Sequence, residues 1–235
     1  MARFPILMYH KIGVPPEGAK VPHHYVSVDR FKRQICAILR FGFKTTHVST
    51  HEPDVKKPIC LTFDDGYQNF QLAASVLKDN GQTGTVFVVT DLLGRDNRWD
   101  VETGDVPEPL LSADEVLNLH RAGFEFGSHT VTHARLAQID QNLAKQEIVR
   151  SKEFLDSLLG SDTQVFCYPY GSHDSDVRLM VQKAGYKWAC SVEKGWNDGQ
   201  TDPFRLKRVN VRRDTSTAVL FWKLWSQARR RTQID

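Results

Sequence analysis

Four side chains able to bind a metal ion or move a proton stand at the ends of predicted strands. The segment LTFDDG places two carboxylates, Asp64 and Asp65, directly after an apolar run, and GSHTVTH places His129 and His133 four residues apart. On a helix or helical turn, that spacing points both imidazoles in one direction, close enough to share a metal ion. Two histidines and one carboxylate are a common zinc-type set that leaves positions open for water and substrate.

Two adjacent carboxylates repel each other when they are buried, unless something compensates their charge. A divalent cation bound to one of them removes the repulsion and leaves the other as a base. The alternative for Asp-Asp-Gly is a cap and charged first turn of the following helix, and for the histidines two unrelated residues. Because both pairs follow strand ends of the same predicted sheet, the sequence favours a metal site, with which a helix cap is compatible.

The rest of the chain alternates short apolar strands with helices. Strands are predicted at residues 5–10, 58–63, 85–89, 124–126, 165–168 and 188–191, and helices within 26–42, 67–80, 112–122, 140–159 and 174–184. Ser27 is predicted to cap the first helix, and Ser112 with Glu115 to form a capping box. Residues 91–109 show no periodicity and indicate a loop. Repeated βα units imply a mostly parallel sheet, open or closed as a barrel, with the chemistry at the carboxyl ends of the strands.

Composition and charge are those of an ordinary globular protein. Of 235 residues, 40% are apolar and 25% charged, and without a repeat or polar linker we expect one domain, residues 1–235. The net charge of +3 is too small to indicate a nucleic-acid partner. The cysteines form no CxxC pair and are interpreted as reduced core residues: Cys36, Cys60, Cys167 and Cys190. Since the N-terminal apolar run is too short for a signal or a membrane span, we expect a cytoplasmic location.

The C-terminal segment AVLFWKLWSQARRR predicts a basic amphipathic helix over about residues 215–231. Phe221, Trp222, Leu224 and Trp225 stand beside the basic cluster, as they do in helices that lie at a membrane interface. Two interpretations follow. The helix packs on the barrel wall, which we favour, or it makes a peripheral contact with the inner face of a membrane.

The motifs TFDDG, SHTVTH and YPYG, in this order and spacing, resemble the polysaccharide deacetylase family, the family 4 carbohydrate esterases that share the NodB homology domain. The opening ILMYH and the later DPFRLKRVNV resemble the subgroup that deacetylates poly-N-acetylglucosamine, in which the motif order is circularly permuted. The resemblance covers nearly all of residues 5–212. It implies an α/β fold, a distorted (β/α)7 TIM-like barrel.

The resemblance also implies a role for each residue of the site. Asp64 matches the general base, and Asp65 matches a metal ligand completed by His129 and His133. His10 matches the general acid. Hydrolysis of an acetamide needs these parts independently of the family, because a water must be activated and the departing amine must receive a proton.

Two further catalytic positions follow from the resemblance. Tyr170, in the YPYG turn, matches the position whose backbone N–H helps to hold the oxyanion, and Pro169 beside it is expected to contact substrate. Many relatives have an arginine where Cys167 stands, so the partner of Asp64 must come from elsewhere. Arg208, in the LKRV segment, is the candidate.

The loops RDNRWDVETG and EKGWNDG contain Trp99 and Trp196. We expect these indoles to stack on sugar faces at the barrel mouth, and the alternative is that they anchor their loops.

Together these observations predict a metal-dependent hydrolase that removes an N-acetyl group from an N-acetylated amino sugar in a glycan, glycolipid or saccharide precursor. Zn²⁺ is the expected cofactor, and Co²⁺, Ni²⁺ and Fe²⁺ suit the same ligands. The alternatives are an O-acetyl esterase on the same fold and a catalytically silent sugar-binding relative. A phosphohydrolase with Asp64 as nucleophile needs a second aspartate two positions later, where Gly66 stands.

Overall fold

The computed structural model describes residues 3–50 and 55–228, and its centre is a curled parallel sheet. In these ranges the sheet has eight strands, β1 (Ile6–Tyr9), β4 (Lys44–Thr46), β5 (Pro58–Phe63), β6 (Thr85–Val88), β7 (Glu125–Ser128), β8 (Val165–Cys167), β9 (Trp188–Cys190) and β10 (Val209–Asn210). Their order is β10-β1-β5-β6-β7-β8-β9, and β4 pairs with the first half of β5. Each pairing is parallel, so the carboxyl ends of the strands meet at one end of the sheet.

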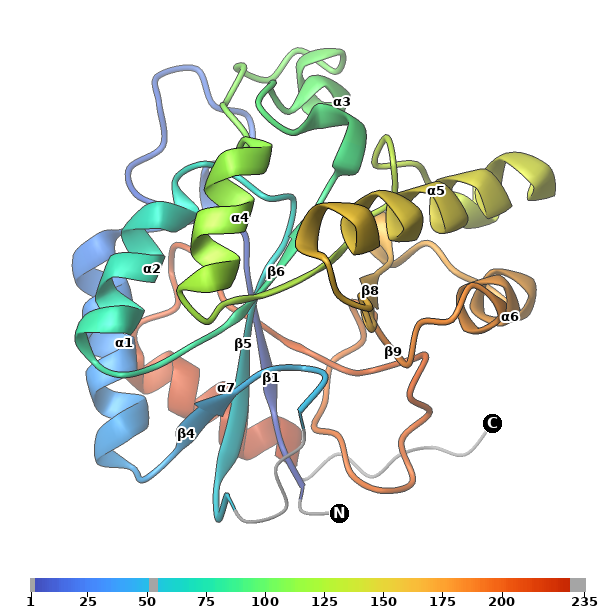
Figure 1. The fold of residues 1–235 in the computed structure, drawn as a ribbon. Coiled ribbons are helices and arrows are strands. Elements are labelled where there is room, and N and C mark those ends of the chain that lie inside the picture. Colours follow the sequence, from blue (N-terminus) through green and yellow to red (C-terminus); the bar gives the residue numbers. More distant parts are fainter. Residues whose placement is uncertain (1–2, 51–54, 229–235) are drawn as a thin grey trace.

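Helices surround the curled sheet (Figure 1). They are α1 (Val28–Arg40), α2 (Phe70–Asp79), α3 (Arg98–Val101), α4 (Ala113–Arg121), α5 (Gln141–Leu159), α6 (Ser175–Lys183) and α7 (Thr217–Ala228). In Figure 1, α1, α2 and α4 lie to one side of the sheet, and α5 and α6 lie to the other. The α/β architecture and the curled parallel sheet agree with the predicted distorted barrel, in the form of a half-barrel.

Local sequence signals explain where the helices begin. The Ser27 side chain accepts a hydrogen bond from the backbone N–H of Arg30 at the start of α1. At the start of α4, Ser112 and Glu115 form the predicted capping box, which satisfies two backbone donors that a helix leaves unpaired. Helix α2 begins at Phe70 rather than at Tyr67, because residues 67–69 form a turn.

The predicted loop at residues 91–109 is interrupted by α3 and by a short 3₁₀ turn, Thr90–Leu92, so the prediction is wrong at these positions. Helix α3 is held by its surroundings rather than by an apolar period. The buried Asn97 side chain accepts a hydrogen bond from the Glu108 backbone N–H at 2.6 Å, which closes the segment onto itself. A four-residue helix is too short to show periodicity in the sequence.

The prediction of core cysteines is correct for three of the four residues. All four are unpaired, and Cys60, Cys167 and Cys190 are buried. Cys36 is exposed, because it falls on the outer face of α1, next to the buried Ile35. The interpretation of Cys36 as a core residue is therefore wrong.

The predicted C-terminal helix is present as α7, and its last predicted residues, 229–231, lie outside the described ranges. Leu220 and Leu224 are buried, and Phe221 packs against Phe41 at the end of α1 with ring centroids 4.3 Å apart. Packing on the barrel wall, the favoured interpretation, is thus confirmed for the inner face of α7. Among the described residues, no helix has the length and apolar character needed to cross a membrane.

Close backbone contact between β7 and its neighbours generates a prediction. A Cβ at Gly127 would lie 2.5 Å from Val165 Cγ2 and 2.8 Å from Phe87 Cδ1, in the packed interior. We expect Gly127→Ala to destabilise the protein by about 1–3 kcal/mol, measured by urea unfolding, since a closely packed core accommodates an extra methyl poorly.

Gly195→Ala is the matched control, because its Cβ would meet only the flexible Lys207 side chain. We expect that variant to stay within about 0.5 kcal/mol of wild type. Equal stability of the two variants would contradict the described packing around β7.

Candidate functional site

Three buried side chains from two strand ends converge at the carboxyl end of the sheet. His129 Nε2 and His133 Nε2 each lie 3.3 Å from Asp65 Oδ1. The three ligand atoms are close enough together to hold one metal ion. The structure therefore brings together the three residues predicted as metal ligands.

Hydrogen bonds fix the orientation of both imidazoles. His129 Nδ1 lies 2.8 Å from the backbone carbonyl of Cys167, and a carbonyl only accepts, so Nδ1 carries the proton. The neutral form of His129 then has its lone pair on Nε2, the atom that faces Asp65 and that would bind a cation, whereas a protonated Nε2 donates to Asp65. His133 Nδ1 lies 3.1 Å from the Tyr170 hydroxyl. A second hydrogen bond at the far nitrogen is the usual arrangement around metal-bound histidines.

The segment from His129 to His133 is not helical, so the expected helical turn is wrong. Thr130 and His133 have φ values of 70° and 71°, and a chain of side-chain hydrogen bonds holds this loop. Thr130 Oγ1 accepts from the His133 N–H, and Ser128 Oγ accepts from the Thr130 N–H. Glu147 of α5 accepts hydrogen bonds from two further backbone N–H groups of the loop. These hydrogen bonds hold the loop in the shape that brings the two imidazoles together. The four-residue spacing alone does not produce this convergence.

Left-handed backbone at residues other than glycine is concentrated at this site. In the described ranges these residues are Asp65, Thr130, His133 and Tyr170, and each belongs to the cluster or its loops. Such conformations cost free energy and persist where the surrounding structure enforces them, which is common at functional sites. Gly66 also has a positive φ of 73°, and a Cβ there would lie 2.9 Å from Val88 Cγ1, which explains the glycine of TFDDG.

Asp64 is held by a buried arginine, Arg208, which directly precedes the edge strand β10. Arg208 Nη1 and Nη2 donate to the two oxygens of Asp64 at 2.7 and 2.8 Å. Arg208 Nη1 also donates to Thr62 Oγ1, and Nε donates to the Ser191 carbonyl. The structure thus places Arg208 against Asp64, as predicted.

This pairing decides the charge of Asp64. Burial opposes ionisation of the carboxyl, but the charge and hydrogen bonds of Arg208 outweigh it, so the pKa of Asp64 lies below its ordinary value. Burial likewise opposes ionisation of Asp65, and the hydrogen bonds of His129 and His133 hold its pKa well below the usual range. Two adjacent carboxylates are therefore both charged, each with its own partner.

Cys167 stands beside the ion pair and offers a second set of ligand atoms. Its Sγ lies 3.2 Å from Arg208 Nη2 and 3.7 Å from Asp64 Oδ2. Asp64, His129 and Cys167 also have ligand atoms close together. Burial, the largest influence, raises the pKa of Cys167 to about 11, so the thiol is neutral, and both oxygens of Asp64 already accept from Arg208. The set around Asp65 suits a cation better.

His10, the predicted general acid, lies next to these carboxylates. Asp64 follows β5 and donates its backbone N–H to the Tyr9 carbonyl at 3.0 Å, so the two strand ends emerge side by side. The His10 ring stacks on His24 with centroids 4.3 Å apart and planes at 21°. His10 Nδ1 is buried and has no hydrogen-bond partner among the described residues.

His24 is a residue of the site that the sequence analysis missed. Burial, assisted by the charge of His10, lowers the pKa of His24 to about 3, so its ring is neutral against His10. The adjacent pair His23–His24 in a loop is visible in the sequence, but nothing local connects it to His10. Glu147, which shapes the histidine loop, was missed for the same reason.

The turn after β8 places Tyr170 at the site and Pro169 beneath it. Tyr170 has φ 58° and an exposed fraction of 42%, and its ring lies under the Arg135 guanidinium at 3.5 Å. Pro169 is buried in the same turn. The contact of Pro169 with substrate stays a prediction.

The two predicted tryptophans lie at opposite ends of the sheet. Trp99 of α3 stacks on the His133 ring with centroids 4.3 Å apart, so it belongs to the site. Trp196 lies beside the Arg3 guanidinium, and the next residue, Asn197, pairs with Phe4 before the start of β1. The prediction of a substrate contact for Trp196 is wrong. After β9 the chain returns to the amino end of the sheet. The loop that contains Trp196 therefore lies away from the carboxyl ends of the strands, where the site is.

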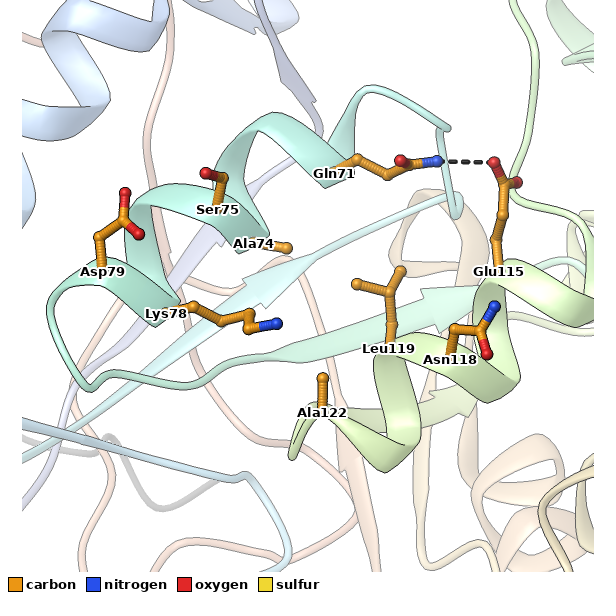
Figure 2. A pocket seen from close by; sticks show the side chains of 9 residues that line it. All are labelled: Gln71, Ala74, Ser75, Lys78, Asp79, Glu115, Asn118, Leu119 and Ala122. Atoms are coloured by element: carbon orange, nitrogen blue, oxygen red, sulfur yellow. Dashed lines mark hydrogen bonds between the residues drawn. The ribbon is translucent and has the colours of Figure 1, made fainter.

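A separate hollow on the outer wall, between α2 and α4, contains none of these residues (Figure 2). Gln71 donates to Glu115 across it, and Lys78, Asn118 and Leu119 are among its lining residues. This hollow lacks the buried, convergent ligand atoms of the strand-end cluster. We therefore assign the functional site to the cluster.

The comparison with protein families agrees with this geometry. The model of the family described as polysaccharide deacetylase matches residues 51–189. The chain belongs to the polysaccharide deacetylase family. The matched range contains the carboxylate pair, the histidine loop and the YPYG turn, and it excludes His10 and Arg208. These two residues come from the ends of the chain, in keeping with the permuted motif order.

Relatives of this polysaccharide deacetylase domain share most of the chain. YxkH of Bacillus subtilis (strain 168) is 26% identical over 218 residues, 89% of this chain and 72% of that protein. The poly-beta-1,6-N-acetyl-D-glucosamine N-deacetylase of Staphylococcus epidermidis is 24% identical over 178 residues, 71% of this chain. The match spans 59% of the length of that relative.

Solved structures confirm the predicted fold of the family. The Streptococcus pyogenes deacetylase PplD in complex with acetate superposes with a TM-score of 0.82 at 26% identity, over 95% of this chain and 98% of that one. IcaB from Ammonifex degensii superposes with a TM-score of 0.77 at 21% identity, over 94% and 97%, and shows the fold alone.

The buried pair of Asp64 and Arg208 generates a prediction about stability. Arg208→Met leaves the Asp64 charge buried without its partner, so we expect a loss of about 3–5 kcal/mol in the free energy of unfolding at neutral pH. Asp64→Asn leaves Arg208 uncompensated and is expected to destabilise too. The double variant should recover part of the loss, a coupling of about 2 kcal/mol in a double-mutant cycle by urea unfolding.

The more exposed pair Arg205–Glu193 is the control, and Arg205→Met should cost less than about 1 kcal/mol. The folded pKa of Asp64 is lowered, so its contribution is present above the unfolded carboxyl pKa of about 4 and is lost as the pH falls through the folded value. Additive effects of the two single substitutions would show that the pair does not act as a unit.

Proposed function

We propose that this protein is a metal-dependent hydrolase that removes the N-acetyl group from an N-acetylated amino sugar. The observation that carries the proposal is the convergence of Asp65, His129 and His133 beside a second carboxylate, Asp64, that Arg208 holds charged. One carboxylate is thus positioned for a cation and the other for a proton.

The residues present fit a divalent cation. Asp65 Oδ1 and the Nε2 atoms of His129 and His133 would hold it, since both imidazoles turn Nε2 toward the carboxylate. The bound cation supplies Lewis acidity, which lowers the pKa of a water molecule and polarises the acetyl carbonyl. Zn²⁺ is the proposed ion because two imidazoles and one carboxylate suit it, and Co²⁺, Ni²⁺ and Fe²⁺ remain compatible with the same donors.

Asp64 is the proposed general base. Its charge is maintained by Arg208, and the bidentate contact fixes the carboxylate in one orientation. It takes the proton of the attacking water, which leaves the acetamide carbon as a tetrahedral centre. The backbone N–H of Tyr170 is the proposed donor to the oxyanion, as the family position implies.

His10 is the proposed general acid that protonates the departing amine nitrogen. The stacked His24 ring fixes the plane of His10, and His24 is neutral, so it adds no charge that would repel a protonated His10.

An N-acetylglucosamine unit is the proposed substrate. The Staphylococcus epidermidis relative is a deacetylase of poly-beta-1,6-N-acetyl-D-glucosamine, and the permuted motif order supports the same sugar here. Trp99 is proposed to contact the bound sugar, and one face of its indole rests on His133.

A deacetylation assay tests the proposal. Oligomers of β-1,6-linked N-acetylglucosamine are incubated with zinc-loaded protein, and the mass loss of one acetyl group is followed by mass spectrometry. We expect wild type to act, and His10→Gln to fall about 10²–10⁴-fold in kcat because it removes the proton donor. Asp65→Asn should lose zinc, measured by titration calorimetry, together with activity.

Asp64→Asn should retain zinc and lose turnover, because an amide does not take the proton. Circular dichroism establishes that each assayed variant is folded, and His10→Gln tests the mechanism without disturbing the Arg208 pair. Full activity in both His10→Gln and Asp64→Asn would contradict the proposed roles. Turnover of O-acetylated but not N-acetylated sugars would identify an esterase instead.

A further inference from the structure

The outer face of α7 is apolar. Val219, Trp222 and Trp225 have exposed fractions of 38%, 63% and 56%. The opposite face, with Leu220 and Leu224, is buried against the barrel. The helix therefore has one apolar side that the barrel covers and a second that it does not, which is unusual for a surface helix.

The apolar surface continues beyond α7. Phe41, at the end of α1, is 56% exposed, and its ring lies 4.3 Å from that of Phe221. Figure 1 shows α7 on the outside of the fold, near the lower end of α1. We call the set Phe41, Val219, Trp222 and Trp225 the α7 ridge.

Basic side chains surround the α7 ridge. Arg3 donates to the carbonyl of Ala228 at the end of α7, and Lys57 donates to the carbonyl of Phe41. Lys194 and Arg212 lie close enough to Lys223 of α7 to lower its pKa, after the larger effect of burial. Asp214 also lies near Lys223 and raises its pKa. In the sequence three further arginines follow Ala228.

We propose that the α7 ridge docks this protein on the surface of an anionic phospholipid bilayer. Tryptophan is the side chain that best suits the headgroup region, since its ring is apolar and its N–H bonds to water or phosphate. The basic rim then faces lipid phosphates. A second copy of this chain fits the ridge less well, because two identical basic rims would face each other.

The proposed orientation is compatible with the site. The ridge residues are distinct from the residues around Asp64 and Asp65, and α7 lies on the outer wall rather than at the carboxyl ends of the strands. Docking would therefore hold the barrel by its side and leave the mouth open to a glycan. The inference is independent of the proposed deacetylation.

A vesicle sedimentation experiment with the full chain tests the proposal. The vesicles are phosphatidylcholine alone, and phosphatidylcholine mixed with phosphatidylglycerol. We expect wild type to sediment with the anionic vesicles, with a blue shift of tryptophan fluorescence, and to detach at high salt. Trp222→Ala/Trp225→Ala should reduce the partition coefficient by roughly tenfold or more, and Arg212→Gln by about fivefold.

Leu143→Ala/Phe154→Ala is the matched control, because it removes two exposed apolar side chains from α5 and should leave binding unchanged. The tryptophan variant should keep wild-type activity on soluble oligomers, which separates this test from that of the proposed function. Equal vesicle binding by the tryptophan variant and wild type would overturn the proposal. Loss of a dimer in that variant, seen by analytical ultracentrifugation in the absence of lipid, would instead assign the ridge to a second copy.

Discussion

The site depends on the separate compensation of two adjacent buried carboxylates. Asp64 and Asp65 are consecutive in the chain and both nearly inaccessible, a combination that would cost several kcal/mol if either charge lacked a partner. Arg208 compensates Asp64 from inside the barrel, and two imidazoles face Asp65 from β7. Each carboxylate can thus have its own chemistry, one as a base and one as a ligand.

Because each of the two carboxylates has its own partner, the site is assembled from distant parts of the chain. The small Cys167 side chain lies beside the ion pair, and Arg208 reaches Asp64 from the segment before β10. The left-handed residues Asp65, His133 and Tyr170 are strained positions, and packing of the strand ends supplies the free energy that holds them. The pairing of charges and the left-handed backbone conformations therefore both depend on how the strand ends pack together.

Much of this could be predicted from local sequence. Buried parallel strands are continuous apolar runs, so PILMYH and PICLTF indicate β1 and β5, and the residues that follow them are the site. The contact of Arg208 with Asp64 was predicted from the family resemblance, which implied that the partner of Asp64 does not come from position 167. Features that depend on long-range packing were not predictable. β10 is two residues long, the stacking of His24 on His10 joins distant segments, and the path of the chain past Trp196 leaves no local signal.

The central claim is that one cation is held by Asp65, His129 and His133, while Asp64 stays outside its coordination shell. A crystal of the zinc-loaded protein, measured on both sides of the zinc absorption edge, tests this most directly. We predict one anomalous peak about 2.0–2.2 Å from Asp65 Oδ1 and from the Nε2 atoms of both histidines, with Asp64 still bound to Arg208. A peak coordinated by Asp64 and Cys167, or no peak between the three predicted ligands, would contradict the account.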